Sequence, residues 1–271
     1  YISLAMLDST HFVAGYRDYS NSNRGTAIVG TVSGTAISYG SEYVFNSGAT
    51  YFVSVAMIDA THFAVEYQDT GNSSKGTAIV GTISGTTISY GSEYVFNAAS
   101  TGYVSLAMID TTHFVAGYQD VGNSNKGTAI VGTISGTAIS YGSEYVFNVA
   151  SAFYVSVAML DATHFVVAYQ DRSNTSYGTA VVGTISGTTI SYGSEYVFNS
   201  GISAYISTAA LDATHFVAGY VDSSNSYYGT AIVGTVSGTT ISYGSEYVFS
   251  AIDTYSLSVA MLDATHFVVG Y

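Results

Sequence analysis

The sequence contains no cysteine and no proline, and it has few charged residues. Without cysteine the chain can form no disulfide and no thiolate metal site, and its redox compartment stays open. The absence of proline is unusual for a protein rich in turns. Asp, Glu, Lys and Arg make up 8% of the 271 residues, against roughly 25% in an average globular domain. Solubility must therefore depend on Ser, Thr, Asn, Gly and Tyr.

Positive charge is especially scarce. There are 5 Lys and Arg against 18 Asp and Glu, which gives a formal net charge of −13. This charge argues against attraction to nucleic acid or to an anionic membrane surface. No apolar run reaches the roughly 18 residues of a membrane-spanning helix, and no signal peptide is recognisable. We therefore expect no nucleic-acid partner and no membrane insertion. Because the sequence begins inside a repeat, we expect a processed product or a fragment of a longer chain.

What the sequence does contain is a 51-residue repeat. Thr-His-Phe occurs six times, with histidines His11, His62, His113, His164, His215 and His266. SYGSEYVF occurs only five times, with glutamates Glu42, Glu93, Glu144, Glu195 and Glu246. A 51-residue unit is too small to bury its own core, so the repeats must pack against one another. Repeats start near residues 1, 52, 103, 154 and 205, and a partial repeat covers 256–271.

Each repeat reads as four short strands. In the repeat 52–102 we expect strand a at 52–58, strand b at 62–69, strand c at 76–83 and strand d at 86–96, bent at Gly91. Val, Ile, Thr, Tyr and Phe fill these segments, and none shows helical periodicity. Asp59 and the residues after it form the a–b turn. Gly85 suits the c–d turn because glycine tolerates positive φ. Residues 70–75 and 97–102 are expected to be the b–c and d–a loops.

Four antiparallel strands in about 50 residues correspond to one β-propeller blade. We predict an all-β fold: a β-propeller of four-stranded antiparallel blades in a single domain, residues 1–271. The chain runs a-b-c-d five times and then a-b once, which favours six blade positions with the last incomplete. A five-bladed ring is the alternative. A β-solenoid competes less well, because its coils are usually shorter.

The strand a and b segments VAMLD and HFVVAYQD, within residues 157–171, loosely resemble the first strands of NHL-type propeller blades. They also resemble repeat-amplified propellers of the lectin-like type. The resemblance extends over the whole chain through the repeats. It implies a propeller fold and carries over no catalytic residue.

The repeats vary at only two of their connections. The a–b and c–d turns barely change, whereas the b–c and d–a loops differ from repeat to repeat. In a four-stranded meander these two loops lie at the same end, so we expect one variable face and one constant face. All the basic residues fall in or beside b–c loops: Arg17, Arg24, Lys75, Lys126 and Arg172. Binding residues often collect on loops of a rigid scaffold, but neutral drift of longer loops is the simpler alternative.

The candidate ligand-binding residues are therefore on the variable face. They are Asp18, Asn21, Asp69, Asn72, Asp120, Asn123, Asp171, Asn174, Asp222, Asn225 and Tyr228. One Asp and one Asn per loop are few ligands for Ca²⁺, which takes six to eight oxygens, so we expect no cofactor and keep Ca²⁺ as an alternative. The Asp-Asn pairs could equally stabilise the loops themselves.

Other repeated ionisable residues have structural explanations. Each His follows a turn and is expected to pair locally with Asp or backbone, since symmetry-related blades are too far apart to share a metal. The Asp that opens each a–b turn can accept backbone N–H groups. The glutamates of strand d are expected to protect an outer edge strand from aggregation. The singular ionisable residues, Glu66, Arg17, Arg172 and Asp253, form no catalytic constellation.

These features predict a non-enzymatic binding module that is extracellular or surface-exposed. Its expected partner is a glycan or surface polymer, bound through repeated weak sites that gain avidity. One alternative is a structural subunit of a fibre, sheath or surface layer that associates with copies of itself. A second alternative is a lyase or hydrolase on a propeller scaffold.

Overall fold

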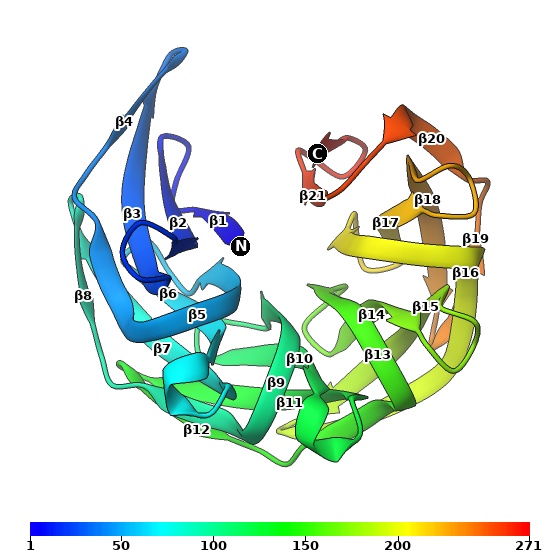
Figure 1. Ribbon diagram of the computed structural model, residues 1–271, viewed down its shortest axis with the longest axis horizontal. Helices are drawn as coiled ribbons and strands as arrows, with labels where there is room; N and C mark the ends of the chain where they lie inside the picture. Colours follow the sequence, from blue (N-terminus) through cyan, green and yellow to red (C-terminus); the bar gives the residue numbers. More distant parts are fainter. The chain divides into compact units, whose positions relative to one another are not determined.

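The computed structural model describes residues 1–271, and nearly all of its regular structure is β-strand (Figure 1). Repeat 1 (residues 1–51) contains β1 (Ile2–Met6), β2 (His11–Asp18), β3 (Arg24–Ser33), β4 (Ala36–Tyr39) and the first part of β5 (Tyr43–Met57). Repeat 2 (52–102) contains the rest of β5, then β6 (His62–Asp69), the 3-10 helix η1 (Thr70–Asn72), β7 (Lys75–Ser84), β8 (Thr87–Tyr90) and the first part of β9 (Tyr94–Met108).

The later repeats follow the same order. Repeat 3 (103–153) has the rest of β9, then β10 (His113–Asp120), η2 (Val121–Asn123), β11 (Lys126–Ser135), β12 (Ala138–Tyr141) and the first part of β13 (Tyr145–Met159). Repeats 4 (154–204) and 5 (205–255) have β14 (His164–Asp171), β15 (Tyr177–Ser186), β16 (Thr189–Ala210), β17 (His215–Asp222), β18 (Tyr228–Ser237), β19 (Thr240–Tyr243) and β20 (Tyr247–Asp253). The partial repeat forms the hairpin of β21 (Ser258–Met261) and β22 (Phe267–Gly270). The two helices are single 3-10 turns, so no helix here has the length or the apolar character to span a membrane.

The chain divides into two compact units. Unit 1 comprises Tyr1–Ala116, Asp120–Asn123 and Val131–Gly142, and unit 2 comprises Gly117–Gln119, Ser124–Ile130 and Ser143–Tyr271. Repeats 1 and 2 therefore belong to unit 1, repeats 4 and 5 with the terminal hairpin belong to unit 2, and repeat 3 contributes to both.

Strands within a repeat pair antiparallel in chain order. In repeat 1, β1 pairs with β2, β2 with β3, and β3 with both β4 and β5. The same pattern holds in repeat 5, where β17 lies between β16 and β18. At the c–d turn Gly85 has φ of +62°, a left-handed conformation that glycine adopts without strain. These observations confirm an all-β fold of repeated antiparallel strands and the glycine at this turn.

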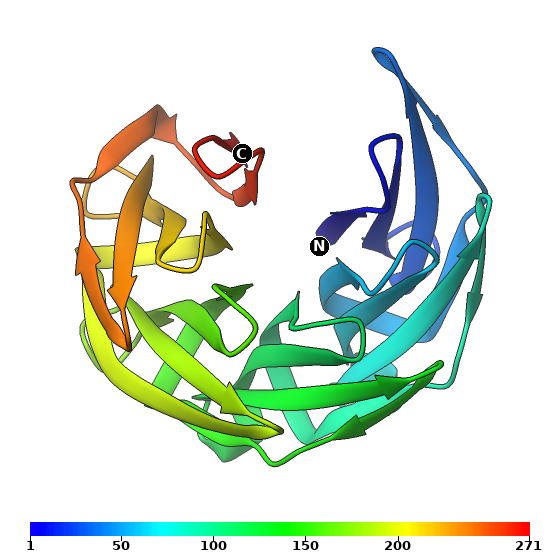
Figure 2. The ribbon, with the colours of Figure 1, turned by 180° about the vertical axis from the view of Figure 1, so that it is seen from behind.

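The prediction of a d–a loop is wrong, because the chain forms a continuous strand there. β5 pairs with β3 through Tyr43–Ala49 and with β6 through Thr50–Met57, so it serves as strand d of one repeat and strand a of the next. Figure 2 shows β16 as another unbroken ribbon of this kind, in yellow-green. The backbone of the connection finds partners of its own: the amide of Thr101 donates to the carbonyl of Ser74 at 2.9 Å. A buried or half-buried connection needs such partners.

In repeat 2, strand d is interrupted where a bend was expected, whereas the equivalent segment of repeat 4 is continuous within β16. β8 ends at Tyr90, and β9 begins at Tyr94 after a short break at residues 91–93. The glycine of strand c has a separate packing role. A Cβ on Gly81 would lie 2.3 Å from Cζ of Phe63, so only glycine lets the phenyl ring lie flat on strand c. Phe63 is fully buried as a result, a burial that contributes roughly 1.5–3 kcal/mol.

The core lies between successive repeats rather than within one. In unit 1, Val13, Val29 and Phe45 of repeat 1 pack with Val55, Val65 and Ile88 of repeat 2 in one cluster. In unit 2, Val182 and Phe198 of repeat 4 pack with Phe216, Ile232 and Ile241 of repeat 5. Each sheet is thus apolar on both faces, which explains how a chain without α-helices can be 48% hydrophobic.

Candidate functional site

The a–b turn is closed by a local Asp-Thr-His cluster. Oδ1 of Asp8 accepts hydrogen bonds from the amide and hydroxyl of Thr10, at 2.6 and 2.8 Å, and from the amide of His11 at 2.8 Å. Nδ1 of His11 lies 2.9 Å from Oδ2 of Asp8. The Thr10 amide and then its hydroxyl lower the pKa of Asp8 to about 2, with a further contribution from His11.

The same Asp–His contact recurs in all six a–b turns, with Nδ1 to Oδ2 distances of 2.9–3.0 Å. The expectation of a locally paired histidine is therefore confirmed. Because each Asp and His already holds its own turn, the constant end of a repeat offers few free groups to a ligand. The structure brings no group of three His, Asp or Glu side chains together in a way that could hold a metal ion.

The glutamate of each SYGSEYVF segment accepts a hydrogen bond from a tyrosine of strand b in the same repeat. The hydroxyl of Tyr67 donates to Oε1 of Glu93 at 2.7 Å, and that of Tyr169 donates to Glu195 at 2.6 Å. Equivalent bonds join Tyr16 to Glu42, Tyr118 to Glu144 and Tyr220 to Glu246. Burial and then the carboxylate partner raise the pKa of Tyr67 above its ordinary value. Sequence reasoning missed this pair, although both residues recur in every full repeat.

At the other end of a repeat, the b–c loop lies beside the d–a connection. The hydroxyl of Thr70 donates to the carbonyl of Ala49 at 2.7 Å, and the amide of Thr50 donates to the carbonyl of Asn23 at 2.9 Å. The variable segments of a repeat therefore share one end, as their sequence order implies. We call this the loop end of a repeat, defined by its b–c loop and d–a connection.

The Asp carboxylates of the candidate site accept hydrogen bonds from other residues of the loop end. Oδ1 of Asp69 accepts from the Asn46 side chain at 3.0 Å and from the Gly71 amide at 3.0 Å. Asp120 is bonded to Asn97 in the same way. Asp171 accepts from the amide and hydroxyl of Ser173. Four of the five are buried: Asp69, Asp120, Asp171 and Asp222. Asp18 is half-buried and holds its own loop by accepting from Ser20 and Asn21.

The Asn residues of the site are placed differently. Asn72, Asn123, Asn174 and Asn225 are exposed on the loops, whereas Asn21 is half-buried with its Oδ1 3.4 Å from Nη1 of Arg24. Tyr228 is half-buried at the start of β18, where its amide donates to the carbonyl of Asn225. The structure therefore does not present Asp and Asn as a joint pair of free side chains. It leaves the amide of Asn exposed and uses the carboxylate of Asp to shape the loop.

An aromatic series at the start of strand a is the feature that sequence reasoning did not find. Phe52, Tyr103, Tyr154 and Tyr205 all have positive φ, between +49° and +52°. This conformation is strained for a bulky side chain and costs about 1–3 kcal/mol per residue. Phe52, Tyr154 and Tyr205 lie where the strand pairing shifts register, for example between Tyr51 and Ser54 at Phe52. The recurrence of an aromatic residue every 51 positions was a usable signal, but the backbone strain was not visible.

The rings of this series contact one another within each unit. In unit 1 the ring of Phe52 lies 4.8 Å, between centroids, from both Tyr1 and Tyr103. In unit 2 the rings of Tyr154 and Tyr205 are 5.1 Å apart. The planes are tilted by 44–55°. The series lies at the loop end, because its neighbour Tyr51 pairs with Gln68 near the end of strand b. The guanidinium of Arg17 also lies there, 4.0 Å from the Tyr51 ring centroid.

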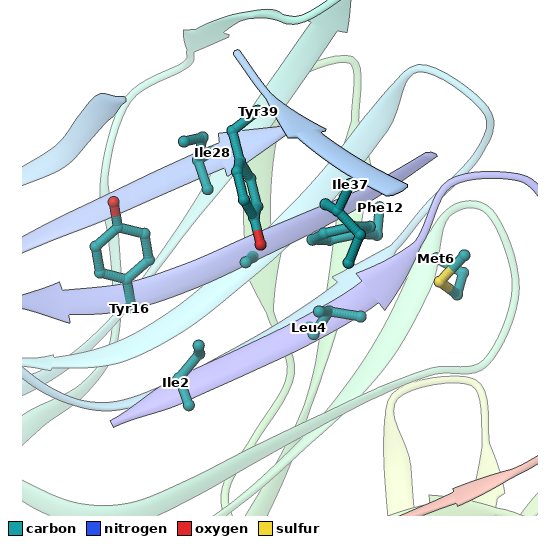
Figure 3. Close-up of a pocket in the computed structure, with 9 residues that line it drawn as sticks. Ile2, Leu4, Met6, Phe12, Tyr16, Ile28, Ile37 and Tyr39 are labelled. Atoms are coloured by element: carbon teal, nitrogen blue, oxygen red, sulfur yellow. The ribbon is translucent and has the colours of Figure 1, made fainter. Parts of the chain in front are cut away.

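A cavity of about 600 Å³ lies on repeat 1, and its lining is almost entirely apolar. Figure 3 shows Ile2, Leu4, Ile37 and Tyr39 around it, from β1 and β4. Equivalent side chains in later repeats are covered by the preceding repeat: Leu4 is 53% exposed, whereas Val55 is 7% exposed. This surface has the chemistry of a repeat-to-repeat interface and not of a pocket for hydroxyl-rich ligands.

No protein family and no curated protein matches the sequence. Among solved structures, the chain is similar to AofleA from Arthrobotrys oligospora, with a TM-score of 0.63 and 8% identity over 99% of this chain and 77% of that one. A triple arginine-to-alanine variant of AofleA gives the same TM-score at 7% identity and the same coverage. Sqt1 of Chaetomium thermophilum, bound to the N-terminus of ribosomal protein L10, has a TM-score of 0.57 and 8% identity over 94% of this chain and 66% of that one. At such low identities, the likeness to AofleA and Sqt1 is one of fold alone.

Proposed function

We propose that the chain forms one β-propeller domain with six blade positions, the last of them two-stranded, and that it binds glycans or surface polymers outside the cell through its loop ends. The repeated four-strand pattern and the fold likeness to AofleA and Sqt1 support the propeller. The activity is binding without catalysis, because nearly every ionisable residue is repeated five or six times and each a–b turn Asp and His is used within its own turn.

The strained aromatic series is the observation that carries the binding proposal. Four aromatic residues hold a backbone conformation that costs free energy, and they do so at the same position of four repeats. Strain of this kind persists where the surrounding structure imposes it, and it collects at functional sites. Tyr1 and Tyr205 are exposed, and Phe52, Tyr103 and Tyr154 are half-buried, so ring edges reach the surface at the loop end.

The chemistry of this end suits hydroxyl-rich polymers. An aromatic ring can stack on the C–H face of a sugar while amides and hydroxyls beside it bond the sugar hydroxyls. Exposed Asn72 and Asn123 supply amides with both donors and acceptors on the adjoining loops. A single such site is weak, but several sites on one scaffold gain avidity towards a repetitive ligand.

A structural subunit of a fibre or surface layer is the second candidate, and the exposed apolar surface of repeat 1 favours it. Ile37 and Tyr39 are exposed there although both are large and apolar. Contiguous apolar surface of this kind often marks an association site. The two candidates differ in assembly, since a structural subunit polymerises and a glycan-binding module stays soluble.

The test is a glycan array probed with the purified chain, with and without a Ca²⁺ chelator, alongside light scattering. The proposal expects saturable binding to one class of glycans and a scattering mass that does not grow with concentration. The double variant Asn72→Ala/Asn123→Ala should weaken binding. Ser84→Ala, at the constant end of repeat 2, is the matched control and should not change it. If no glycan on the array is bound and light scattering detects large assemblies, glycan binding is rejected in favour of the structural subunit.

A further inference from the structure

Two of the five basic residues lie over aromatic rings at the loop end of a repeat. In unit 2 the Cζ atom of Arg172 lies 4.4 Å from the ring centroid of Phe153. In unit 1 the Cζ atom of Arg17 lies 4.0 Å from the ring centroid of Tyr51. Phe153 and Tyr51 occupy the same position in their repeats. A guanidinium is attracted to the face of such a ring, and this contact limits the directions in which its N–H groups can point.

The two arginines reach these rings from different positions of the repeat. Arg17 aligns with Gln119 at the end of strand b, whereas Arg172 aligns with Tyr19 in the b–c loop. The glutamine is used within the fold, since Nε2 of Gln119 donates to the carbonyl of Ala152 at 2.8 Å. The b–c loops of repeats 2, 3 and 5 contain no arginine. The same arrangement of guanidinium and ring therefore arises twice, from two non-equivalent positions.

In both places one edge of the guanidinium is held and another edge is left available. Nε of Arg172 donates to Oε1 of Gln170 at 3.3 Å. Nε and Nη2 of Arg17 donate to Oδ1 of Asn23 at 3.0 and 2.7 Å. Arginine has five N–H donors in a planar fork, so N–H groups on both Nη atoms remain for a further acceptor. Arg172 is exposed and Arg17 is half-buried, so these groups can be reached from solvent.

Neither arginine is paired with a carboxylate of the chain. The carboxylates that contact a side-chain base are those of the a–b turns, and their partner is histidine. Asp171, the neighbour of Arg172 in sequence, is buried and accepts hydrogen bonds from Ser173. Each guanidinium therefore offers its positive charge and two adjacent donors to an anion from outside. A fork of this kind binds a carboxylate or a tetrahedral oxyanion through two parallel hydrogen bonds.

We propose that Arg172 and Arg17 are subsites for the acidic group of a glycan. Two oxygens of a carboxylate or sulfate accept hydrogen bonds from Nη1 and Nη2, while the exposed amide of Asn174, in the same loop as Arg172, bonds hydroxyls of the sugar. The inference rests on the proposed glycan binding and names its substrate class.

The charge of the whole chain limits which acidic glycans fit. The net charge of −13 repels a densely charged polymer. The attraction to an exposed guanidinium is screened beyond about 8 Å at physiological salt. The ligand therefore carries isolated acidic groups rather than a continuous row of them.

The test uses the full 271-residue chain on an array of matched glycan pairs, each with and without a single carboxylate or a single sulfate. We expect the acidic member to bind about tenfold more tightly than its neutral partner, and the type of pair that shows this identifies the oxyanion. The preference should shrink as salt is added.

Variants then locate the subsites by calorimetric titration of the best pair. The double variant Arg17→Gln/Arg172→Gln should lose the preference for the acidic member. Arg17→Lys/Arg172→Lys keeps the net charge but lacks the planar fork, so it should recover only part of the preference. Lys126→Gln removes a positive charge at the start of β11 and is the control, with an expected change of less than about twofold.

Three results would overturn the proposal, and they separate it from glycan binding itself. Equal binding of acidic and neutral members would reject the acidic subsites and leave glycan binding intact. Equal losses from Lys126→Gln and from the double glutamine variant would show a general effect of charge and no subsite. If no member of any pair is bound, both the subsites and the proposed glycan binding are rejected. The unfolding midpoint of each variant, which should match that of the parent, shows that the fold is unchanged.

Discussion

The hydroxyl of Tyr67 donates a 2.7 Å hydrogen bond to Oε1 of Glu93, 26 residues further along the chain. Tyr67 is fully buried and Glu93 is exposed, so the bond connects β6 to the exposed break between β8 and β9. A hydrogen bond to a charged partner contributes about 1.5–3 kcal/mol. Tyr67→Phe should therefore lower the free energy of unfolding by about this amount in urea titrations. Tyr39→Phe, whose hydroxyl is on an exposed side chain, is the control, and equal effects of the two changes would contradict the assignment.

Glu66 is predicted to destabilise the protein at neutral pH. Its side chain is 0% exposed, neither carboxylate oxygen has a hydrogen-bond partner, and burial raises its pKa well above the ordinary 4.5. The equivalent residues are Gly15, Gly117, Ala168, Gly219 and Gly270. A Cβ on Gly15 would lie 2.6 Å from Val55 of the next repeat, so this position faces a packed interface.

The sign of the pH effect follows from the raised pKa. Above about pH 4.5 the unfolded chain loses the Glu66 proton and the folded chain keeps it, so stability falls as pH rises towards the folded pKa. Glu66→Gln removes the ionisable group and with it this pH-dependent loss of stability. Urea unfolding at pH 5, 6, 7 and 8 should show the variant gaining on the parent by up to about 1.4 kcal/mol per pH unit. A difference that does not change with pH would show that Glu66 is not protonated in the folded state.

The Asp-Thr-His turns give an opposite pH dependence. Bonds from Thr10 lower the pKa of Asp8 from 3.8 to about 2. Asp8 therefore contributes stability above pH 3.8, and this contribution is lost as pH falls through about 2. Asp8→Asn should lower the melting temperature at pH 6, and the gap to the parent should narrow towards pH 2. A gap that is the same at pH 2 as at pH 6 would contradict this role of Asp8.

Substituting Tyr103 should affect glycan binding more than it affects the free energy of unfolding. Tyr103→Gly removes a half-buried ring but also releases backbone strain of about 1–3 kcal/mol, so the net change in unfolding free energy should stay within about 1 kcal/mol. By contrast, Phe114→Ala removes a fully buried ring and should cost about 3–5 kcal/mol. If the aromatic series binds glycans, Tyr103→Gly should weaken binding to the array hit about tenfold. Unchanged binding would remove the series from the site.

The exposed surface of repeat 1 allows a matched comparison of two isoleucines. Ile37 is exposed on β4, and its equivalent Ile88 is buried on β8 against repeat 1. Ile88→Ala should lower the free energy of unfolding by about 2–5 kcal/mol, and Ile37→Ala should lower it by less than about 0.5 kcal/mol. Chemical denaturation of the two variants measures both. Similar losses would mean that Ile37 is covered in solution.

Much of the fold could be predicted because it depends on local patterns. Alternating apolar residues, the 51-residue period and turn residues such as Asp59 and Gly85 act within a few positions of one another. They determined the strands, the turn conformations and the local Asp-His pair. The sequence also placed the b–c loops and d–a connections at the same end, since that follows from the order of antiparallel strands.

Only the tertiary structure determined which of these side chains remain available to a ligand. Asp69 was a candidate ligand by composition, but Asn46 from the preceding repeat binds its carboxylate, a contact 23 residues away in sequence. The sequence around Phe52 is typical of a strand and gives no sign of an unusual backbone. In the structure Phe52 has a positive φ at the point where the pairing of β5 with β6 shifts register. Local propensity specifies elements, whereas burial, long-range hydrogen bonds and backbone strain arise only when two repeats pack together, because each repeat is too small to define its own interior.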